Sequence, residues 1–82
     1  MTDKVNGYPV IGFIETETQD GVSCGYILVW SGHDWITAWW RTGDTQWCNG
    51  HYHEDDMEGA LADFTKRAST YLANRSVLVK EQ

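Results

Sequence analysis

The sequence predicts an α+β fold: a four-stranded antiparallel β-meander packed on one face by a single C-terminal amphipathic helix. Two patterns favour this class. Residues 10–53 hold β-rich runs that are separated by short turn sequences with a glycine in each. From residue 56 the apolar side chains instead recur at the helical spacing of about 3.6 residues. A chain of 82 residues has room for one domain, so we expect residues 1–82 to form a single unit.

The predicted meander follows a polar, loose N-terminal segment, residues 1–9. Asp20 and Gly21 lie between the first two runs, and Asp-Gly is a strong hairpin signal because both residues tolerate positive φ. Gly32-His33 and Gly43-Asp44 supply the next two turns. We therefore place the strands at residues 10–18, 23–31, 35–41 and 45–53. Gly50 is a candidate position for a β-bulge in the last of them.

The predicted helix spans residues 56–74. Asp55 and Glu58 have the spacing of a capping box at its start, and Asp63 and Arg67 have the spacing of an i, i+4 ion pair. After it, residues 76–82 are expected to form a short fifth strand or a docking tail. The apolar residues that define the helical face are Met57, Ala60, Leu61, Phe64, Ala68, Tyr71 and Leu72.

Two-residue turns fix which residues lie opposite each other, so the predicted sheet has one aromatic and one aliphatic face. The aliphatic face carries Ile14, Ile27, Val29 and Ile36, with Gly12, Gly25 and Ala38 leaving room for a helix. We expect the helix to cover this face, with Trp40 and Trp47 also buried there. The aromatic face is then left open. If the faces are exchanged, an apolar face still lacks a helix.

The aromatic face is the predicted binding surface, because rings with N–H or O–H groups suit half-wet interfaces. A second copy of the chain, residues 1–9 or the C-terminal tail could also cover it, since large apolar patches are rare on monomers. The predicted binding residues are Glu15, Glu17, Tyr26, Trp30, Trp35, Trp39, Arg41 and Tyr52.

Charge narrows the class of partner. Twelve Asp and Glu against six Lys and Arg leave a net charge of −6, which disfavours direct binding of nucleic acid. Residues 54–58 add a second acidic cluster, so we expect a basic protein partner or a homodimer. By analogy of size and charge alone, the chain could be a phage or mobile-element inhibitor, like anti-CRISPR proteins, of a basic nucleic-acid-binding host protein. The alternative is a small-ligand or carbohydrate-binding domain that uses the same aromatic face.

The sequence contains no catalytic motif, so we expect neither an enzyme nor a bound cofactor. Cys48, His51 and His53 resemble a fragment of a zinc site, but strand alternation places Cys48 on the opposite face from both histidines unless Gly50 is bulged. We therefore expect no metal. A looser group of His33, Asp34 and His53 at one sheet edge is expected to make turn hydrogen bonds.

Cys24 and Cys48 are predicted to lie two strands apart, at least about 9.6 Å, which is too far for a disulfide. Free thiols indicate a reducing compartment, and the N-terminus lacks the apolar stretch of a signal peptide. No apolar run approaches the length of a membrane span. We therefore expect a cytoplasmic protein that does not bind membranes.

Overall fold

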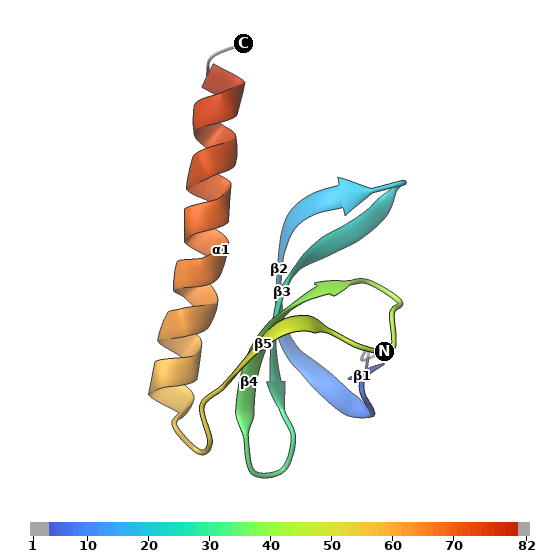
Figure 1. Ribbon diagram of the computed structural model, residues 1–82, viewed down its shortest axis with the longest axis vertical. Coiled ribbons are helices and arrows are strands. Elements are labelled where there is room, and N and C mark those ends of the chain that lie inside the picture. Colours follow the sequence, from blue (N-terminus) through green and yellow to red (C-terminus); the bar gives the residue numbers. More distant parts are fainter. Residues whose placement is uncertain (1–3, 81–82) are drawn as a thin grey trace.

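The computed structural model describes residues 4–80, with side chains for residues 4–70. Five strands form one antiparallel sheet in the order in which they occur in the chain, and one long helix follows them (Figure 1). The α+β class and the antiparallel sheet are confirmed. Within the described part of the chain, no helix is both long and apolar enough to cross a membrane. The elements are β1 (Lys4–Val5), β2 (Tyr8–Gln19), β3 (Val22–Trp30), β4 (Trp35–Arg41), β5 (Cys48–Tyr52) and α1 (Met57–Lys80).

The central hairpin, β3 and β4, has the register that the sequence predicts. Trp30 lies opposite Trp35, and the pairing continues without interruption to Cys24 opposite Arg41. The turn between these strands is short, and Gly32 adopts a φ of 108° that an L side chain rarely reaches. A tight turn therefore sets the register of both strands.

Strand β2 departs from the predicted register. Glu17 lies opposite Cys24 as predicted, but a shift between Glu15 and Glu17 moves the pairing of residues 12–15 by one place. A second shift, between Val10 and Gly12, moves the pairing of Val10 by one place more. Ile14 consequently lies opposite Tyr26, so the predicted pairs of Glu15 with Tyr26 and of Ile14 with Ile27 are wrong. Because side chains alternate with a period of two, one extra residue transfers this stretch of β2 to the other face of the sheet.

The strand that was not predicted is β1, near the N-terminus. Lys4 and Val5 pair with Pro9 and Tyr8, and Val5 is fully buried, so the expectation of a loose segment is wrong for residues 4–9. Residues 1–3 lie outside the described residues. The sequence Asn6-Gly7 carries the signal for this hairpin, since both residues have positive φ, at 52° and 83°. The polar composition of the segment concealed the signal.

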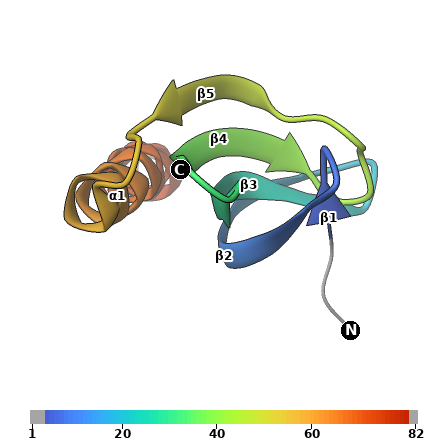
Figure 2. The ribbon, with the colours of Figure 1, turned by 90° about the horizontal axis from the view of Figure 1, so that it is seen from below.

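The sheet curls so that the β1–β2 turn approaches the loop before β5 (Figure 2). The backbone N–H of Asn6 donates to the carbonyl of Thr45 at 2.7 Å, which joins the β1–β2 turn to the loop before β5. The enclosed face holds an apolar core, and Val10 and Trp47 pack against it half-buried. The core residues are Val5, Ile27, Val29, Ile36, Ala38 and Trp40.

Helix α1 covers the aromatic face, which corrects the predicted placement. Phe64 packs with Leu28 of β3, and its ring lies 3.4 Å from the position of a Cβ on Gly12. Ala60 and Ala68, one turn to either side, are also buried. The reason is the curl: the aliphatic face closes on itself, so the other face receives the helix.

The bounds and contact face of α1 also differ from prediction. Met57 and Leu61 were expected against the sheet, but they are 50% and 45% exposed. The helix continues through residues 76–80, so the predicted C-terminal strand is wrong. Residues 75–80 contain neither glycine nor proline, which leaves no strong helix breaker after residue 74.

Candidate functional site

The predicted binding residues do not form one open aromatic face. Tyr26, Trp30, Trp35 and Trp39 are all half-buried, because α1 lies over part of the face. The guanidinium of Arg67 lies 4.7 Å from the centre of the Tyr26 ring. Trp30 and Trp35 contact each other with ring centroids 4.9 Å apart and a tilt of 39°. The structure therefore brings Trp30 and Trp35 together and places Tyr26 under the helix.

The other predicted binding residues lie at the periphery and have local partners. Tyr52 lies opposite Ile36, so it belongs to the enclosed face, where it is 59% exposed and accepts a hydrogen bond from Trp47 at 3.3 Å. The bulge in β5 accounts for this change of face. The charged residues pair as follows: Arg41 with Asp44 at 3.9 Å, Glu15 with the hydroxyl of Ser23, and Glu17 with the amide of Gln19 at 3.0 Å.

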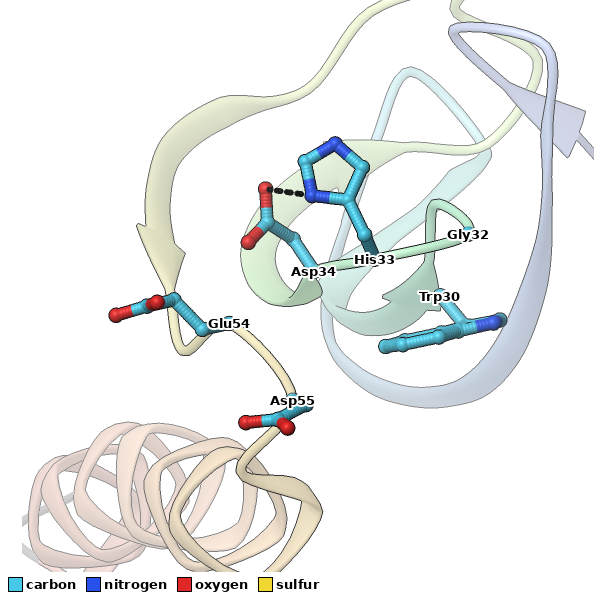
Figure 3. A pocket seen from close by; sticks show the side chains of 6 residues that line it. All are labelled: Trp30, Gly32, His33, Asp34, Glu54 and Asp55. Atoms are coloured by element: carbon cyan, nitrogen blue, oxygen red, sulfur yellow. Dashed lines mark ion pairs between the residues drawn. The ribbon is translucent and has the colours of Figure 1, made fainter.

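A pocket of about 400 Å³ lies beside Trp30, at one end of the molecule's β3–β4 turn (Figure 3). One wall is the β3–β4 turn, and the other is the segment that joins β5 to α1. Trp30 supplies an aromatic side, and the remaining side chains are acidic apart from one imidazole. The lining residues are Trp30, Gly32, His33, Asp34, Glu54 and Asp55.

The β3–β4 turn that forms the first wall is closed by its own hydrogen bonds. The N–H of Ser31 donates to the carbonyl of Asp34 at 3.0 Å, and the N–H of Asp34 donates to the Ser31 hydroxyl at 3.1 Å. The carboxylate of Asp34 is 25% exposed and lies 3.7 Å from the imidazole of His33, which is 87% exposed. Turn hydrogen bonding by Asp34 agrees with the sequence, but His53 does not join this pair.

His53 instead belongs to a polar cluster between the sheet and α1, centred on Asp63. One oxygen of Asp63, Oδ2, accepts from the hydroxyl of Thr37 at 2.5 Å and lies 3.0 Å from His51 Nδ1 and 3.2 Å from His53 Nε2. Burial acts to raise the pKa of Asp63, but the bonds from Thr37, His51 and His53, with the charge of His51, outweigh it. The pKa of Asp63 is therefore lowered, and the carboxylate is ionised at neutral pH.

Arg67 extends this cluster along the same side of α1. Its guanidinium donates to the carbonyl of Thr37 at 3.1 Å, to the Thr37 hydroxyl at 3.2 Å and to the carbonyl of Asn49 at 2.9 Å. Asn49 lies in the bulge of β5 and has a φ of 54°. Asp63 and Arg67 thus each bond to the sheet, and the ion pair that their spacing predicts is not found between these two residues.

A bulge is present in β5 beside Gly50, and it changes the face on which Cys48 lies relative to His51. Trp39 lies opposite Cys48 and Thr37 lies opposite His51, so two residues of β5 occupy the space opposite one residue of β4. Cys48 and His51 therefore share a face, and the parity argument against their combination is wrong. Among the described residues, no group of three or more His, Cys, Asp or Glu side chains has the geometry to hold a metal ion. Cys24 is buried, Cys48 is exposed, and both are free thiols.

The Asp63 cluster was not predicted from the sequence, although the spacing of His51 and His53 offered a signal. Alternate residues of one strand share a face, so two histidines at this spacing can meet one group on a covering helix.

Comparison with protein-family models, with curated proteins and with solved structures found no significant match.

Proposed function

We propose that this protein is an interaction module that binds a basic protein partner and receives a lysine or arginine side chain in the Trp30 pocket. One observation carries the proposal: Trp30 and three acidic residues, Asp34, Glu54 and Asp55, line the same pocket. No lysine or arginine is among the lining residues.

This lining suits a cation for two separate physical reasons. An indole attracts an ammonium or guanidinium group through its π-system, by about 0.5–1 kcal/mol at exposed sites. Carboxylates add charge-assisted hydrogen bonds, and a guanidinium can donate to two of them at once. Trp30 is held for this role by its contact with Trp35, so little side-chain freedom is lost on binding.

The charge of the whole chain supports the same class of partner. A net charge of −6 attracts a basic surface over a distance and raises the rate of encounter. We therefore expect affinity to fall from low to physiological ionic strength, mainly through a slower association rate. Binding that does not depend on salt would contradict the electrostatic part of the proposal.

A free small-molecule ligand is the second candidate. A volume of about 400 Å³ falls within the range of small-ligand pockets. A neutral sugar could stack on Trp30, as the alternative reading of the sequence suggests. Sugar binding would be insensitive to salt and to the charge of Glu54, which separates it from the favoured proposal.

An oligo-arginine peptide, with an oligo-glutamate peptide as the control, tests the proposal by calorimetry and by amide chemical shifts. Glu54→Gln should weaken oligo-arginine binding roughly two- to fivefold, the range of an exposed ion pair. Glu58→Gln is the matched control, because Glu58 is also an exposed glutamate but does not line the pocket. Equal effects of the two variants, or no binding of oligo-arginine, would refute the proposal. Salt-independent binding of neutral disaccharides would favour the sugar-binding alternative.

A further inference from the structure

The acidic wall of the pocket lies on a segment that belongs to no strand or helix. Glu54 and Asp55 follow the end of β5 and precede the start of α1. Glu54 has a φ of 52°, in the left-handed region that costs a residue with a side chain about 1 kcal/mol or more. The surrounding structure must therefore hold this segment in place.

Backbone hydrogen bonds provide part of this restraint. The N–H of His53 donates to the carbonyl of Trp35 at 2.8 Å, and the N–H of Trp35 donates to the carbonyl of Glu54 at 2.7 Å. Trp35 is the residue against which Trp30 packs, so the two walls of the pocket meet at the first residue of β4. The position of residues 53–54 is thereby linked to that of the aromatic wall.

The side chain of His53 provides the other part. Its Nε2 lies 3.2 Å from Oδ2 of Asp63, which is fixed by a hydrogen bond from the fully buried Thr37. His51 meets the same oxygen at 3.0 Å, but it lies inside β5 and is paired with Thr37 through the sheet. Of these two histidines, only His53 is next in sequence to a residue that lines the pocket, Glu54.

We propose that His53 is a positioning residue for the pocket: its bond to Asp63 ties the Glu54–Asp55 wall to α1 and sets where the two carboxylates lie. This inference rests on the proposed function, in which the Glu54–Asp55 wall binds a cation. His53 lies outside the pocket and sets the affinity of the pocket for that cation.

The test compares His53→Phe with His51→Phe. Each variant removes one imidazole from the same carboxylate oxygen and keeps an aromatic ring of similar size. His53→Phe should weaken oligo-arginine binding roughly two- to tenfold, the equivalent of one hydrogen bond, whereas His51→Phe should change it less than about twofold. His53→Gln keeps an N–H donor that can reach Asp63, so it should restore most of the affinity that the phenylalanine variant loses.

The amide ¹H and ¹⁵N chemical shifts of Trp35 in the ligand-free protein give a second readout, because this N–H donates to the carbonyl of Glu54 and is distant in sequence from His53. They should move further in His53→Phe than in His53→Gln or His51→Phe. If wild-type protein does not bind oligo-arginine, the proposed function fails, but these shifts still test the positioning. If oligo-arginine binds wild-type protein and His53→Phe equally well, the positioning role is refuted while the proposed function stands.

Discussion

The two faces of the central hairpin are covered by different means. The enclosed face is apolar, and the curl of the sheet closes it with Val5 and Trp40 among the buried residues. Over the part of α1 whose side chains are described, residues 57–70, the other face receives the helix through the Phe64 ring and through the polar bonds of Asp63 and Arg67. The comparison shows that the sheet has a core of its own, whereas this part of the helix relies largely on directional contacts. Polar side chains are therefore found where the first half of α1 meets the sheet.

Trp40→Ala should produce the largest loss of folding stability, because Trp40 is 2% exposed within the enclosed core. Truncation of a buried tryptophan costs about 3–5 kcal/mol, which is a large part of the roughly 4–12 kcal/mol expected for a domain of this size. Trp40 also donates to the carbonyl of Asp44 at 2.8 Å, and this bond is lost. Denaturant unfolding measures the effect.

Trp39→Ala is the control for that experiment. Trp39 is the neighbour of Trp40, but it lies half-buried on the face that receives α1. The Trp39→Ala protein should therefore lose clearly less folding stability than the Trp40→Ala protein. A larger loss for Trp39→Ala would reverse the ranking of the two faces.

Gly25→Ala should rank second, because it sets the new methyl group against backbone. A Cβ on Gly25 would overlap the backbone carbonyl oxygen of Ile14, and neither strand can move away without breaking the sheet. Overpacking of this kind costs about 1–3 kcal/mol or more. Gly12→Ala meets only the Phe64 ring at 3.4 Å, so its free energy of unfolding should stay close to that of the wild type. Equal losses in thermal unfolding would contradict this view of the two strand glycines.

Asp63→Asn should rank third and depend on pH. At pH 7 the free energy of unfolding should fall by about 1–3 kcal/mol, since the buried Thr37 hydroxyl and the imidazoles of His51 and His53 lose their charged acceptor. Because the folded-state pKa of Asp63 is lowered, its contribution is complete above the ordinary value of 3.8 and is lost as the pH falls through the lowered pKa.

Unfolding of wild-type and Asp63→Asn protein at a series of pH values tests this sign. The two stabilities should converge as the pH falls below 3.8. A constant difference down to the most acidic point would show that the carboxylate does not act through its charge.

Leu61→Gln should have the smallest effect, within about 0.5 kcal/mol, because Leu61 is 45% exposed on α1. Phe64→Leu, three residues further along the helix, should cost measurably more, since Phe64 is the ring that meets the sheet. A destabilisation by Leu61→Gln that matches Phe64→Leu would show that α1 contacts the sheet with a wider face than the structure describes.

The sequence by itself determines the local features of this protein. The class, the β3–β4 register and the start of α1 follow from turn residues and apolar periodicity, which act over a few neighbours. Asn6-Gly7 carried an equally local signal for the β1–β2 hairpin, although the polar composition concealed it. Of the residues that line the pocket, the sequence singles out Trp30 as an aromatic binding candidate and Glu54 and Asp55 as part of an acidic cluster.

Only the tertiary structure decides which face each side chain occupies and which segments meet. The bulges in β2 and β5 each add one residue, and with a side-chain period of two this reverses the face of every residue up to the next irregularity. The curl of the sheet then decides where α1 packs. His53, Asp63 and Thr37 meet only because distant segments are brought together by that packing, and the pocket forms because the turn before β4 and the segment after β5 meet at Trp35. Such contacts depend on the shape of the whole chain, which no local pattern encodes.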